Sequence, residues 1–443
     1  METGFTVNYT FPLCGTRVKM KKRTTDTTSR NKNWFRIRFI AFLLPSLILL
    51  GGFLYSMSNT PPDIRQTVQA TIRCESETFQ GEAVLVTHLD KPLEFRCNVD
   101  TSSIYIENGY IPAPAEYQWS AASGQIHAKG DQCSWSDPHP GLQTIHASGT
   151  LVFLPPSTSK PKIICQFSAS LACMVPLKAD RIIGGKINGF EIGVYPDPYN
   201  PADRKKAGAP ERILAHADIY SPPKLFYIVT PETYFVRIFN DYTLGEFDLD
   251  PRFIPLDYPR YIAINPKLLQ KMDLLHRQLI ADGVYVSKFK IIYGFRSPAY
   301  NIGSWKKDGD ETLKEPFSAH MYGLALDFIV DEDNDYVIDD LNRDGKIDFR
   351  DAQVLLRAVD KVDNQLLAQR SDLVGGAGYY YHHDFWERGR FVQSPYVHMD
   401  IRGHTREDGS LIRWTGKDTI GVLSMKSPYR HQSSLPPHPL LNP

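Results

Sequence analysis

The chain has 443 residues, in which 50 Lys and Arg residues balance 50 Asp and Glu residues to a formal net charge of +0. This length accommodates two or three domains with cores of ordinary size. The balanced charge gives no indication of nucleic-acid binding, so we expect no nucleic-acid partner. One asymmetry lies beneath the balance, because residues 17–38 contain nine basic residues and one acidic residue, Asp26.

An uncharged apolar stretch over residues 39–57 follows this basic segment. As a helix its nineteen residues, at about 1.5 Å each, would extend roughly 28 Å, close to the thickness of a bilayer's hydrocarbon core. A cleaved signal peptide is the alternative, but the stretch is longer than the usual signal core, and no small-residue cleavage site or lipobox cysteine follows it. We therefore predict a signal-anchor transmembrane helix over 39–57.

The positive-inside rule then gives the orientation of the chain. It places a basic tail, residues 1–38, in the cytoplasm and the later domains in the periplasm or otherwise outside the cytoplasm. We accordingly expect a single-pass protein of the cell inner membrane. The cysteines fit this placement, because Cys14 lies in the tail and the other five lie between residues 74 and 173. Five cysteines cannot all pair within one chain, so one of them would stay free.

A short linker over 58–70 leads into residues 71–175, whose pattern is all-β. Short apolar runs are separated by clusters of Gly, Pro, Asp and Ser, which is typical of a β-sandwich; the runs are residues 83–87, 93–97, 117–120, 143–147 and 163–167. Cys97, Trp119 and Cys165 follow the order of an immunoglobulin-like core, with a Cys97–Cys165 bridge as a guess. The domain is most simply a spacer, and a binding role is the alternative.

Residues 176–255 form a connecting region, rich in Pro, Tyr and Asp, with strand-like runs at 190–196 and 224–229. Its fold does not follow from the pattern. Beyond it, apolar residues at three- and four-residue spacing predict a helix from Pro266 to about Asp282. The run 284–293, rich in β-branched and aromatic residues, predicts a strand that ends in a turn at residues 294–298.

The first chemical motif lies on a predicted buried strand over 324–330. On this strand Asp327 shares a face with Ala325 and Ile329. An ionised carboxylate on such a face costs several kcal/mol unless it is paired or bound to a metal. His320 lies seven residues before Asp327. The alternatives are a turn-capping role for Asp327 and a structural role for His320.

The second motif lies in the run 394–403, which we also predict to be a strand. Alternation places His398, Asp400 and Arg402 on one face and apolar residues on the other. A solvated strand face is the alternative, but three aligned ionisable side chains are hard to explain as packing. Together the two motifs offer two imidazoles and one or two carboxylates, a ligand set suited to zinc with an open position for water. Sulfur is not among the ligands, because the last 270 residues contain no cysteine.

A family resemblance follows from these residues. The run Ser318-x-His320-x-x-Gly323-x-Ala325-x-Asp327, preceded by Gly294-Phe295-Arg296-Ser297 and followed by the His398 strand, resembles the zinc D,D-peptidase and Hedgehog-type fold. This family includes peptidoglycan carboxypeptidases and endopeptidases of the D-Ala-D-Ala type, and the similarity covers about residues 256–416. It implies that His320, Asp327 and His398 bind zinc. It also implies that Arg296 steadies the substrate carbonyl or the developing oxyanion.

The sequence departs from the family at the general base. Many members carry Glu or Asp three residues before the second His, where this chain has Pro395. Asp400 is our replacement candidate, because a separation of two residues along a strand keeps it on the face of His398. A general base must reach the zinc-bound water. Three weaker candidates for this role are His382, His383 and Glu315.

An independent motif lies between the two halves of the proposed zinc site. Residues 340–351 match an EF-hand calcium loop that ends in Asp rather than Glu, with Gly345 at the sixth position. The predicted calcium ligands are Asp340, Asn342, Asp344, Lys346, Asp348 and Asp351. A solvated acidic loop is the alternative. Residues 331–339 repeat the spacing, with Tyr336 in place of the glycine, and would complete the same site or form a weaker second one. We expect calcium to stiffen the zinc site rather than to react.

Two further segments carry weaker signals. Residues 375–383, with three glycines and three tyrosines, could line a substrate cleft or form an ordinary glycine turn with core tyrosines. The Pro-rich tail over 426–443 has the composition of a disordered segment.

These patterns predict an α+β zinc-peptidase domain over 256–425, preceded by the immunoglobulin-like sandwich and one N-terminal transmembrane helix. The first functional hypothesis is a membrane-anchored, extracytoplasmic zinc metallopeptidase. This hydrolase would cleave peptidoglycan stem peptides as a carboxypeptidase or endopeptidase, with zinc and calcium as cofactors. The second is a non-catalytic cell-wall or partner-binding module that retains the fold, as Pro395 suggests.

Overall fold

The computed structural model describes residues 61–205, 207, 209–248, 258–301, 315–387 and 390–415, with their side chains except those of Arg181 and residues 382–393. The predicted tail 1–38, the predicted span 39–57 and the Pro-rich tail 426–443 lie outside the described residues.

No helix in the described ranges is long and apolar enough to cross a membrane. The longest of them, α7 (Phe349–Ala368), interleaves charged residues with apolar ones and packs against a sheet. This finding contradicts the transmembrane helix in the predicted fold class and the predicted single-pass localisation. The stretch 39–57, on which both predictions rested, is not among the described residues.

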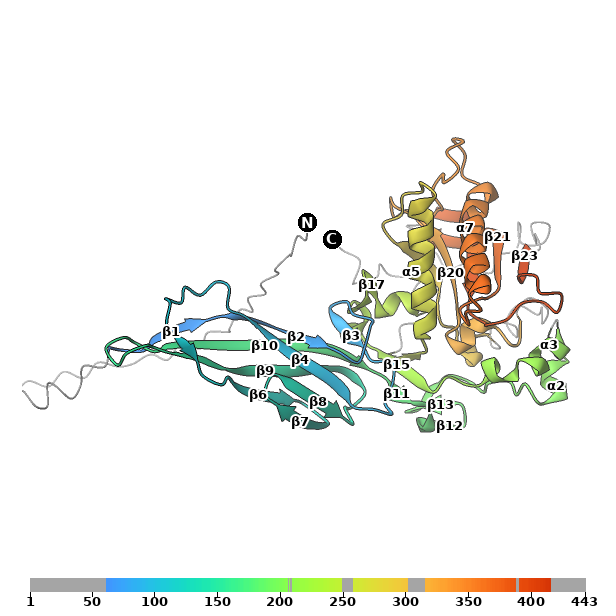
Figure 1. The fold of residues 1–443 in the computed structure, drawn as a ribbon. Coiled ribbons are helices and arrows are strands. Elements are labelled where there is room, and N and C mark those ends of the chain that lie inside the picture. Colours follow the sequence, from blue (N-terminus) through green and yellow to red (C-terminus); the bar gives the residue numbers. More distant parts are fainter. Residues whose placement is uncertain are drawn as a thin grey trace, which may run out of the picture. The chain divides into compact units, whose positions relative to one another are not determined.

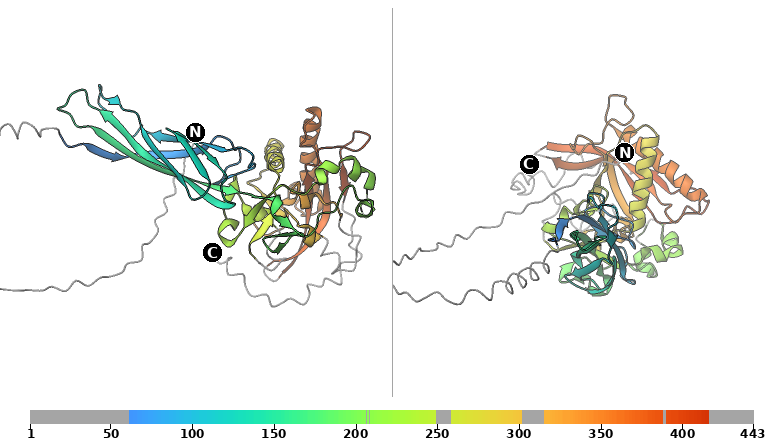
Figure 2. Two further views of the ribbon diagram at one scale, coloured as in Figure 1. Left: turned by 90° about the horizontal axis from the view of Figure 1, so that it is seen from below. Right: turned by 60° about the vertical axis from the view of Figure 1, so that its left-hand side comes forward.

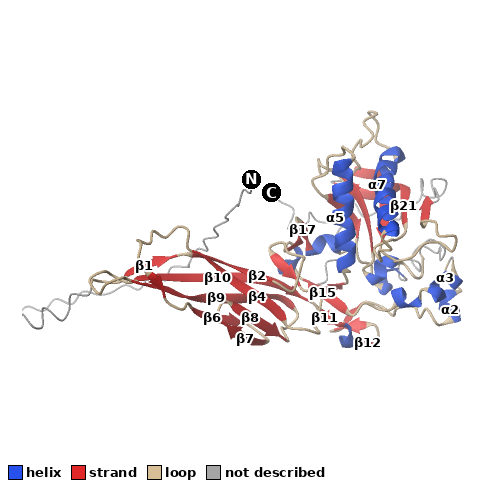
Figure 3. Ribbon diagram, viewed as in Figure 1, coloured by secondary structure: helices blue, strands red, loops and turns tan. Residues whose placement is uncertain are grey.

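The predicted α+β fold class also overstates the helical content of the chain. Across the described ranges, strands in several separate sheets dominate, and two long helices accompany them (Figure 3). Most other helical pieces are single turns, because the segments between strands are short and rich in Pro, Gly and Asp.

The N-terminal part, to Val175, consists of two sheets that enclose one apolar core. The first sheet has the order β1 (Ile64–Thr67), β10 (Ile163–Val175), β9 (Gly141–Leu154) and β5 (Ile111–Pro112), with β3 (Ala83–Leu85) on β10 and β6 (Glu116–Ala121) on β9. The second has the order β2 (Gln69–Cys74), β4 (Leu93–Asp100), β8 (Gln132–Ser136) and β7 (Gln125–Lys129).

The core of this sandwich differs from the predicted one in its central side chains. Trp135 on β8 is fully buried against Phe95, whereas Trp119 is only partly buried and donates its indole N–H to the carbonyl of Gly130. The guessed Cys97–Cys165 bridge is wrong, because the cysteines at 74, 97, 133, 165 and 173 are all buried and unpaired. They fill the core as small apolar side chains.

The connecting region shares its core with the C-terminal part. Its strands β11 (Leu177–Lys178) and β15 (Leu225–Val229) form a sheet with β18 (Arg260–Ile262). Its buried residues belong to the same apolar cluster as those of the last domain. The remaining elements are η1 (Ala179–Arg181), β12 (Ile182–Ile183), β13 (Lys186–Ile187), β14 (Phe190–Glu191), α2 (Pro201–Arg204), α3 (Pro210–Ala215), η2 (Ala217–Tyr220), α4 (Pro231–Tyr234), β16 (Arg237–Phe239), β17 (Tyr242–Thr243) and η3 (Leu244–Phe247).

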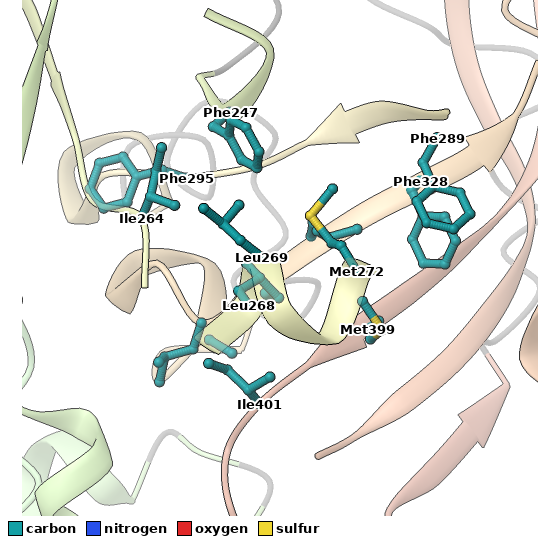
Figure 4. Packing of buried hydrophobic residues seen from close by; sticks show 14 of the residues in the cluster. Phe247, Ile264, Leu268, Leu269, Met272, Phe289, Phe295, Phe328, Met399 and Ile401 are labelled. Carbon is teal, nitrogen blue, oxygen red and sulfur yellow. The ribbon is translucent and has the colours of Figure 1, made fainter. Parts of the chain in front are cut away.

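The C-terminal sheet carries both predicted metal motifs. Its order is β19 (Phe289–Tyr293), β20 (Ala325–Val330), β22 (Arg390–Asp400), β21 (Ala377–Glu387) and β23 (Arg413–Thr415), and η4 (Ala319–Tyr322) precedes β20. The helices α5 (Pro266–Ala281) and α7 lie side by side along this sheet (Figures 1 and 2). Figure 4 shows α5 side chains among those of the sheet, including Met272, Phe328 and Met399.

The helix predicted from Pro266 is confirmed, since α5 begins there with an Asn265 cap and buries its apolar stripe. The strand predicted over 284–293 begins only at Phe289. Residues 284–288 instead form a loop after the helix, in which Val284 N–H bonds back to the carbonyl of Leu279 and Ser287 N–H bonds to the Glu332 carboxylate.

Candidate metal centre

One row of residues crosses all five strands of the C-terminal sheet. In register from β19 to β23 the row is Tyr293, Asp327, His398, Gly378 and Trp414. Val397 and Met399, the neighbours of His398 in the chain, are fully buried in the apolar cluster shared with the helices. Because successive residues of a strand point to opposite faces, the row lies on the face away from that core.

His320 reaches this row from the turn η4. Gly323 ends the turn in the left-handed region, with φ 66°, and an added Cβ there would lie 2.6 Å from the carbonyl oxygen of Ala263. Only glycine fits such a position without strain. The His320 side chain is fully buried, and its Nδ1 lies 2.7 Å from the carbonyl oxygen of Gly294. The glycines of the motif therefore fix where the imidazole points.

Three potential ligand atoms converge in this centre. His320 Nε2 lies 3.1 Å from His398 Nδ1 and 3.3 Å from Asp327 Oδ1, and the last two atoms are 2.8 Å apart. In a tetrahedral zinc site with bonds of about 2.0–2.1 Å, ligand atoms lie about 3.3–3.4 Å apart. The observed separations of 2.8–3.3 Å are equal to this value or slightly shorter, so the ligand atoms would need to move apart by only a few tenths of an ångström to admit an ion.

The outer hydrogen bonds of the two imidazoles decide which nitrogens face the centre as acceptors. The carbonyl of Gly294 accepts a hydrogen bond from His320 Nδ1–H, which leaves a lone pair on Nε2. The carboxylate of Asp400 lies 3.3 Å from His398 Nε2, which leaves the Nδ1 lone pair toward Asp327. Two lone pairs and a carboxylate then face one point. This arrangement is repulsive without a cation, and it fits a divalent metal.

The pKa values of the three groups are shifted in the directions that this crowding requires. Burial lowers the pKa of His320 to about 4, and the Arg296 guanidinium adds to the effect. Burial alone would lower the pKa of His398, but hydrogen bonds to Asp327 and Asp400 outweigh it and raise that pKa. Burial would raise the pKa of Asp327, yet the two imidazoles hold it well below its usual range. A proton retained by the metal-free centre therefore resides on His398.

Asp400 lies behind His398 rather than in front of the metal position. One oxygen accepts from the Gly376 N–H at 2.7 Å, and both accept from the Arg402 guanidinium. Burial would raise its pKa, but Arg402 and His398 hold it well below the usual range. Because it contacts Nε2 while the convergent atom is Nδ1, this placement favours an orienting role over the general-base role that we predict from the sequence.

The backbone of Asp400 is held from the helix side. Lys271 of α5 donates to its carbonyl oxygen at 2.9 Å and pairs with Asp363 of α7 at 2.6 Å, and both of these side chains are completely buried. Arg413 of β23 also pairs with Asp363, at 2.7 Å. Buried pairs of this kind fix position more than they add stability. Both long helices are thereby tied to the end of the His398 strand.

The glycines of residues 375–378 allow close packing at this end of the sheet. An added Cβ would lie 1.9 Å from the Asp400 carbonyl oxygen at Gly375, 2.8 Å from its carboxylate at Gly376 and 2.6 Å from Trp414 Nε1 at Gly378. Of the two sequence alternatives, this favours a packing role for the glycines. The side chains of His382 and His383 lie outside the described residues.

Arg296 lies beside His320, as the resemblance implies. Its backbone N–H donates to the His320 carbonyl, and its guanidinium lies 3.5 Å from Ser318 Oγ and 5.6 Å from the Tyr293 ring centre. Its Nε is buried and has no hydrogen-bond partner within the described part of the chain. A buried donor without an acceptor is costly, and a substrate carbonyl would supply one.

Aromatic side chains that our site prediction omits surround the centre. Tyr380 and Tyr396 stack with ring centres 4.6 Å apart, and the Trp414 ring lies 5.1 Å from that of His398. Trp414 donates its indole N–H to the hydroxyl of Tyr380. Alternation along the second motif places Tyr396 on the His398 face, so sequence could have indicated it. Trp414 had no such signal, because only the parallel pairing of β23 with β21 brings it there.

The predicted calcium loop forms a turn in which acidic side chains accept hydrogen bonds from the loop's own backbone. The two carboxylate oxygens of Asp340 accept from the N–H groups of Asp344 and Gly345, at 3.1 and 2.8 Å. Asp351 is fully buried and accepts from the N–H groups of Leu341, Asn342 and Asp348. Asp344 and Asp348 both pair with Arg350, and Lys346 is exposed.

The preceding acidic run repeats this backbone. Asp331 accepts from the N–H groups of Asp335 and Tyr336, and Tyr336 has φ 67° where Gly345 has φ 80°. Carboxylate oxygens of Asp331, Asp333 and Asp335 lie within 4.8 Å of one another. The two runs are thus structural repeats, each with three acidic or amide side chains at alternate positions.

The fourth candidate base, Glu315, is exposed. Its backbone carbonyl accepts a hydrogen bond from the Asn301 side chain at 3.2 Å.

No family model matches this chain, and no curated protein matches it. The likeness to zinc D,D-peptidases therefore rests on the motif residues and on the geometry described above.

Proposed function

We propose that this protein is a zinc metallopeptidase that hydrolyses peptide bonds in peptidoglycan stem peptides. The observation that carries the proposal is the convergence of His320 Nε2, Asp327 Oδ1 and His398 Nδ1, with both imidazole tautomers set by outer hydrogen bonds. The substrate class comes from the resemblance of these motifs to peptidoglycan peptidases.

Each residue has a distinct task in this proposal. His320, Asp327 and His398 would hold the ion. A bound zinc ion supplies Lewis acidity and lowers the pKa of a coordinated water toward neutrality. Asp400 holds His398 in the tautomer that presents Nδ1, a common role for a carboxylate behind a metal-binding histidine.

Arg296 and the nearby aromatic rings would position the substrate. The buried Nε of Arg296 lacks an acceptor within the described ranges, and a carbonyl oxygen that gains negative charge during attack is the acceptor it suits. The stacked rings of Tyr380 and Tyr396 offer a flat apolar wall that helps to exclude water.

A second function is a non-catalytic wall-binding module. Two observations favour it: Pro395 stands where the family carries its base, and the Asp400 carboxylate is occupied by Arg402 and Gly376. In this case the metal would be structural.

Purified sacculi separate the two functions. With zinc present, the wild type should release soluble peptide fragments, His320→Ala should release none, and His127→Ala, at an exposed position in the sandwich, should behave as wild type. Wild-type protein that binds sacculi and releases nothing would establish the binding module. Protein that neither binds nor cleaves sacculi would contradict both functions.

We also propose that residues 340–351 bind calcium in a structural role. The loop follows β20, which carries Asp327, and leads into α7, which contacts β21 and β22. An ion held here would fix the connection between the metal-bearing strand and the helix behind it.

A further inference from the structure

A short segment of the connecting region packs on the turn that carries His320 and on the loop that follows the His398 strand. Tyr220, at the end of η2, packs edge-to-face on Tyr322 of the His320 turn, with ring centres 5.6 Å apart. His216, just before η2, stacks on His404 with ring centres 3.7 Å apart and planes within 4°. His404 follows the His398 strand by a few residues. Residues 210–220 lie outside the range of the family resemblance, so the resemblance does not predict this contact.

Cationic and imidazole groups gather at this contact. Arg212 lies on α3, one turn before His216, and Arg402 leads from β22 toward His404. Burial lowers the pKa of His404 to about 4, and His216, Arg402 and Arg212 lower it further against a hydrogen bond to the Thr405 carbonyl. The two guanidinium groups therefore lie close enough to act on one ring.

The carboxylate of Asp400 does not neutralise the charge of Arg212, because it already pairs with other residues. Asp400 is occupied by Arg402, which is only 14% exposed, and by His398. Arg212 Nε and His404 Nε2 are buried and have no hydrogen-bond partner among the residues that the structure describes. Gathering like charges is unfavourable, and so is leaving a buried polar atom without a partner. An anion placed here would offset the positive charge, give Arg212 Nε an acceptor and favour protonation of His404 at Nε2.

We propose that Arg212, His216 and His404 form a subsite that binds a carboxylate of the peptide substrate next to the metal centre. A guanidinium fork matches the two oxygens of a carboxylate. His404 Nδ1 donates to the Thr405 carbonyl, so Nε2 of the neutral ring is an acceptor, and it donates to the carboxylate only when the ring takes up a proton that the anion favours. The subsite rests on the proposed function only for the peptide nature of its ligand. The carboxylate has two sources in a stem peptide, the C-terminus and the side chain or free α-carboxylate of an acidic residue.

Matched peptides distinguish these sources. We would use one N-acetylated stem pentapeptide in three forms: a free C-terminus with the acidic residue amidated, an amidated C-terminus with the acidic residue free, and both amidated. Binding to zinc-free protein is measured by calorimetry, and cleavage is measured separately with zinc. We expect one charged form to bind roughly 10–100-fold more tightly than the neutral form, as for a hydrogen-bonded charge.

Variants assign the effect to the subsite. Arg212→Gln should lower the affinity for the tighter-binding charged peptide to that for the neutral peptide, and it should leave the affinity for the neutral peptide unchanged. Arg212→Lys should restore part of the difference between the two affinities. Lys205→Gln, which removes an exposed charge just after α2, is the control and should change nothing. His404→Gln gives a second test if Arg212→Gln fails to fold, and it should also narrow the difference.

Equal affinity of the wild type for all three peptides would contradict the subsite. So would a loss of affinity in Arg212→Gln that is the same for all three peptides. The two proposals fail separately. Cleavage of all three forms at one rate would leave the peptidase standing without the subsite. Carboxylate-dependent binding that needs Arg212, with no cleavage in zinc, would leave the subsite standing without the peptidase.

Discussion

At the scale of single residues, the centre depends on His398, which has a carboxylate on each side of its ring. Asp327 lies 2.8 Å from Nδ1 and Asp400 lies 3.3 Å from Nε2. These contacts raise the pKa of His398 despite its burial. A metal at Nδ1 must therefore displace a proton that the metal-free protein holds more firmly than an ordinary imidazole does.

The affinity for zinc should consequently fall as pH falls. Below the raised pKa of His398 each zinc ion bound should release one proton from this residue, so the logarithm of the association constant should decrease by about one per pH unit. Above that pKa the dependence should flatten. Competition with a chromophoric chelator between about pH 5.5 and 8.5 measures this. An affinity that does not change across this range would contradict the placement of the proton on His398.

Replacement of Asp400 tests whether it orients the ligand or acts as a base. Asp400→Asn should weaken zinc binding roughly 10–100-fold, the usual effect of losing a carboxylate behind a metal-binding histidine. It should also move the pH dependence of binding to lower pH, because the charge that raises the pKa of His398 is lost. A general base that does not touch the ligands would instead lower kcat and leave zinc affinity unchanged, and that result would restore the original hypothesis.

At the scale of elements, the loops after β20 are shaped by hydrogen bonds between their own carboxylates and backbone. Asp340 and Asp331 each accept two backbone N–H groups of their own loops. The turn is thus formed by the chain itself, and an ion would add charge neutralisation to an existing shape.

Calcium should therefore raise the thermal midpoint of the protein without changing its secondary structure. Asp340→Asn should abolish calcium binding by the 340–351 loop, and Asp331→Asn should show whether the preceding run contributes. Calorimetry and differential scanning give the two readouts, with Asp90→Asn, an exposed acid in the sandwich, as the control. Calcium binding that persists in Asp340→Asn would assign the ion to another place.

Some of these elements could be predicted from the sequence and others could not. The helix at Pro266 and the strand around Asp327 followed from strong local patterns, since an apolar stripe and a continuous apolar run are specified by the residues themselves. Strand β19 starts only at Phe289, and the N–H of Ser287 just before it bonds to Glu332, forty-five residues away in the chain. Trp119 and Trp135 look alike in sequence, and only sheet pairing decides which one is buried.

The site divides in the same way. The convergence of His320, Asp327 and His398 could be anticipated from spacing and resemblance, because both motifs carry their own strand signals. The orienting position of Asp400 could not, since it depends on Arg402 and on glycines at residues 375–378. The contacts of His216 were also beyond reach, because the connecting region has no pattern that places it beside His404.

At the scale of the whole molecule, two apolar cores hold the described chain together without covalent links. One core lies in the sandwich and the other joins the connecting region to the C-terminal sheet. Tyr227 of the second core donates its hydroxyl to the carbonyl of Val86 at 2.9 Å. The five cysteines of the sandwich are buried in its core and form no disulfide.

Thiol counts should reflect this. In native protein the five described cysteines should not react with a thiol reagent, because all are buried, and burial raises the pKa of Cys133 to about 11. In denaturant without reductant all six cysteines of the chain should react. A count of four would show that one bridge exists, and a reductant would then lower the unfolding midpoint. We expect no change on reduction.

The strand order of the C-terminal sheet limits the order in which its strands can pair during synthesis. The strand β22, which carries His398, lies between β20 and β21 in the sheet although it follows both in the chain. A nascent chain that has emerged only as far as β21 holds two strands that do not touch each other, and the gap between them closes when β22 arrives. The metal centre therefore comes into being in one late event. Until residue 400 is free of the ribosome, His398 cannot join His320 and Asp327, and the edge strand β23 completes the sheet later still.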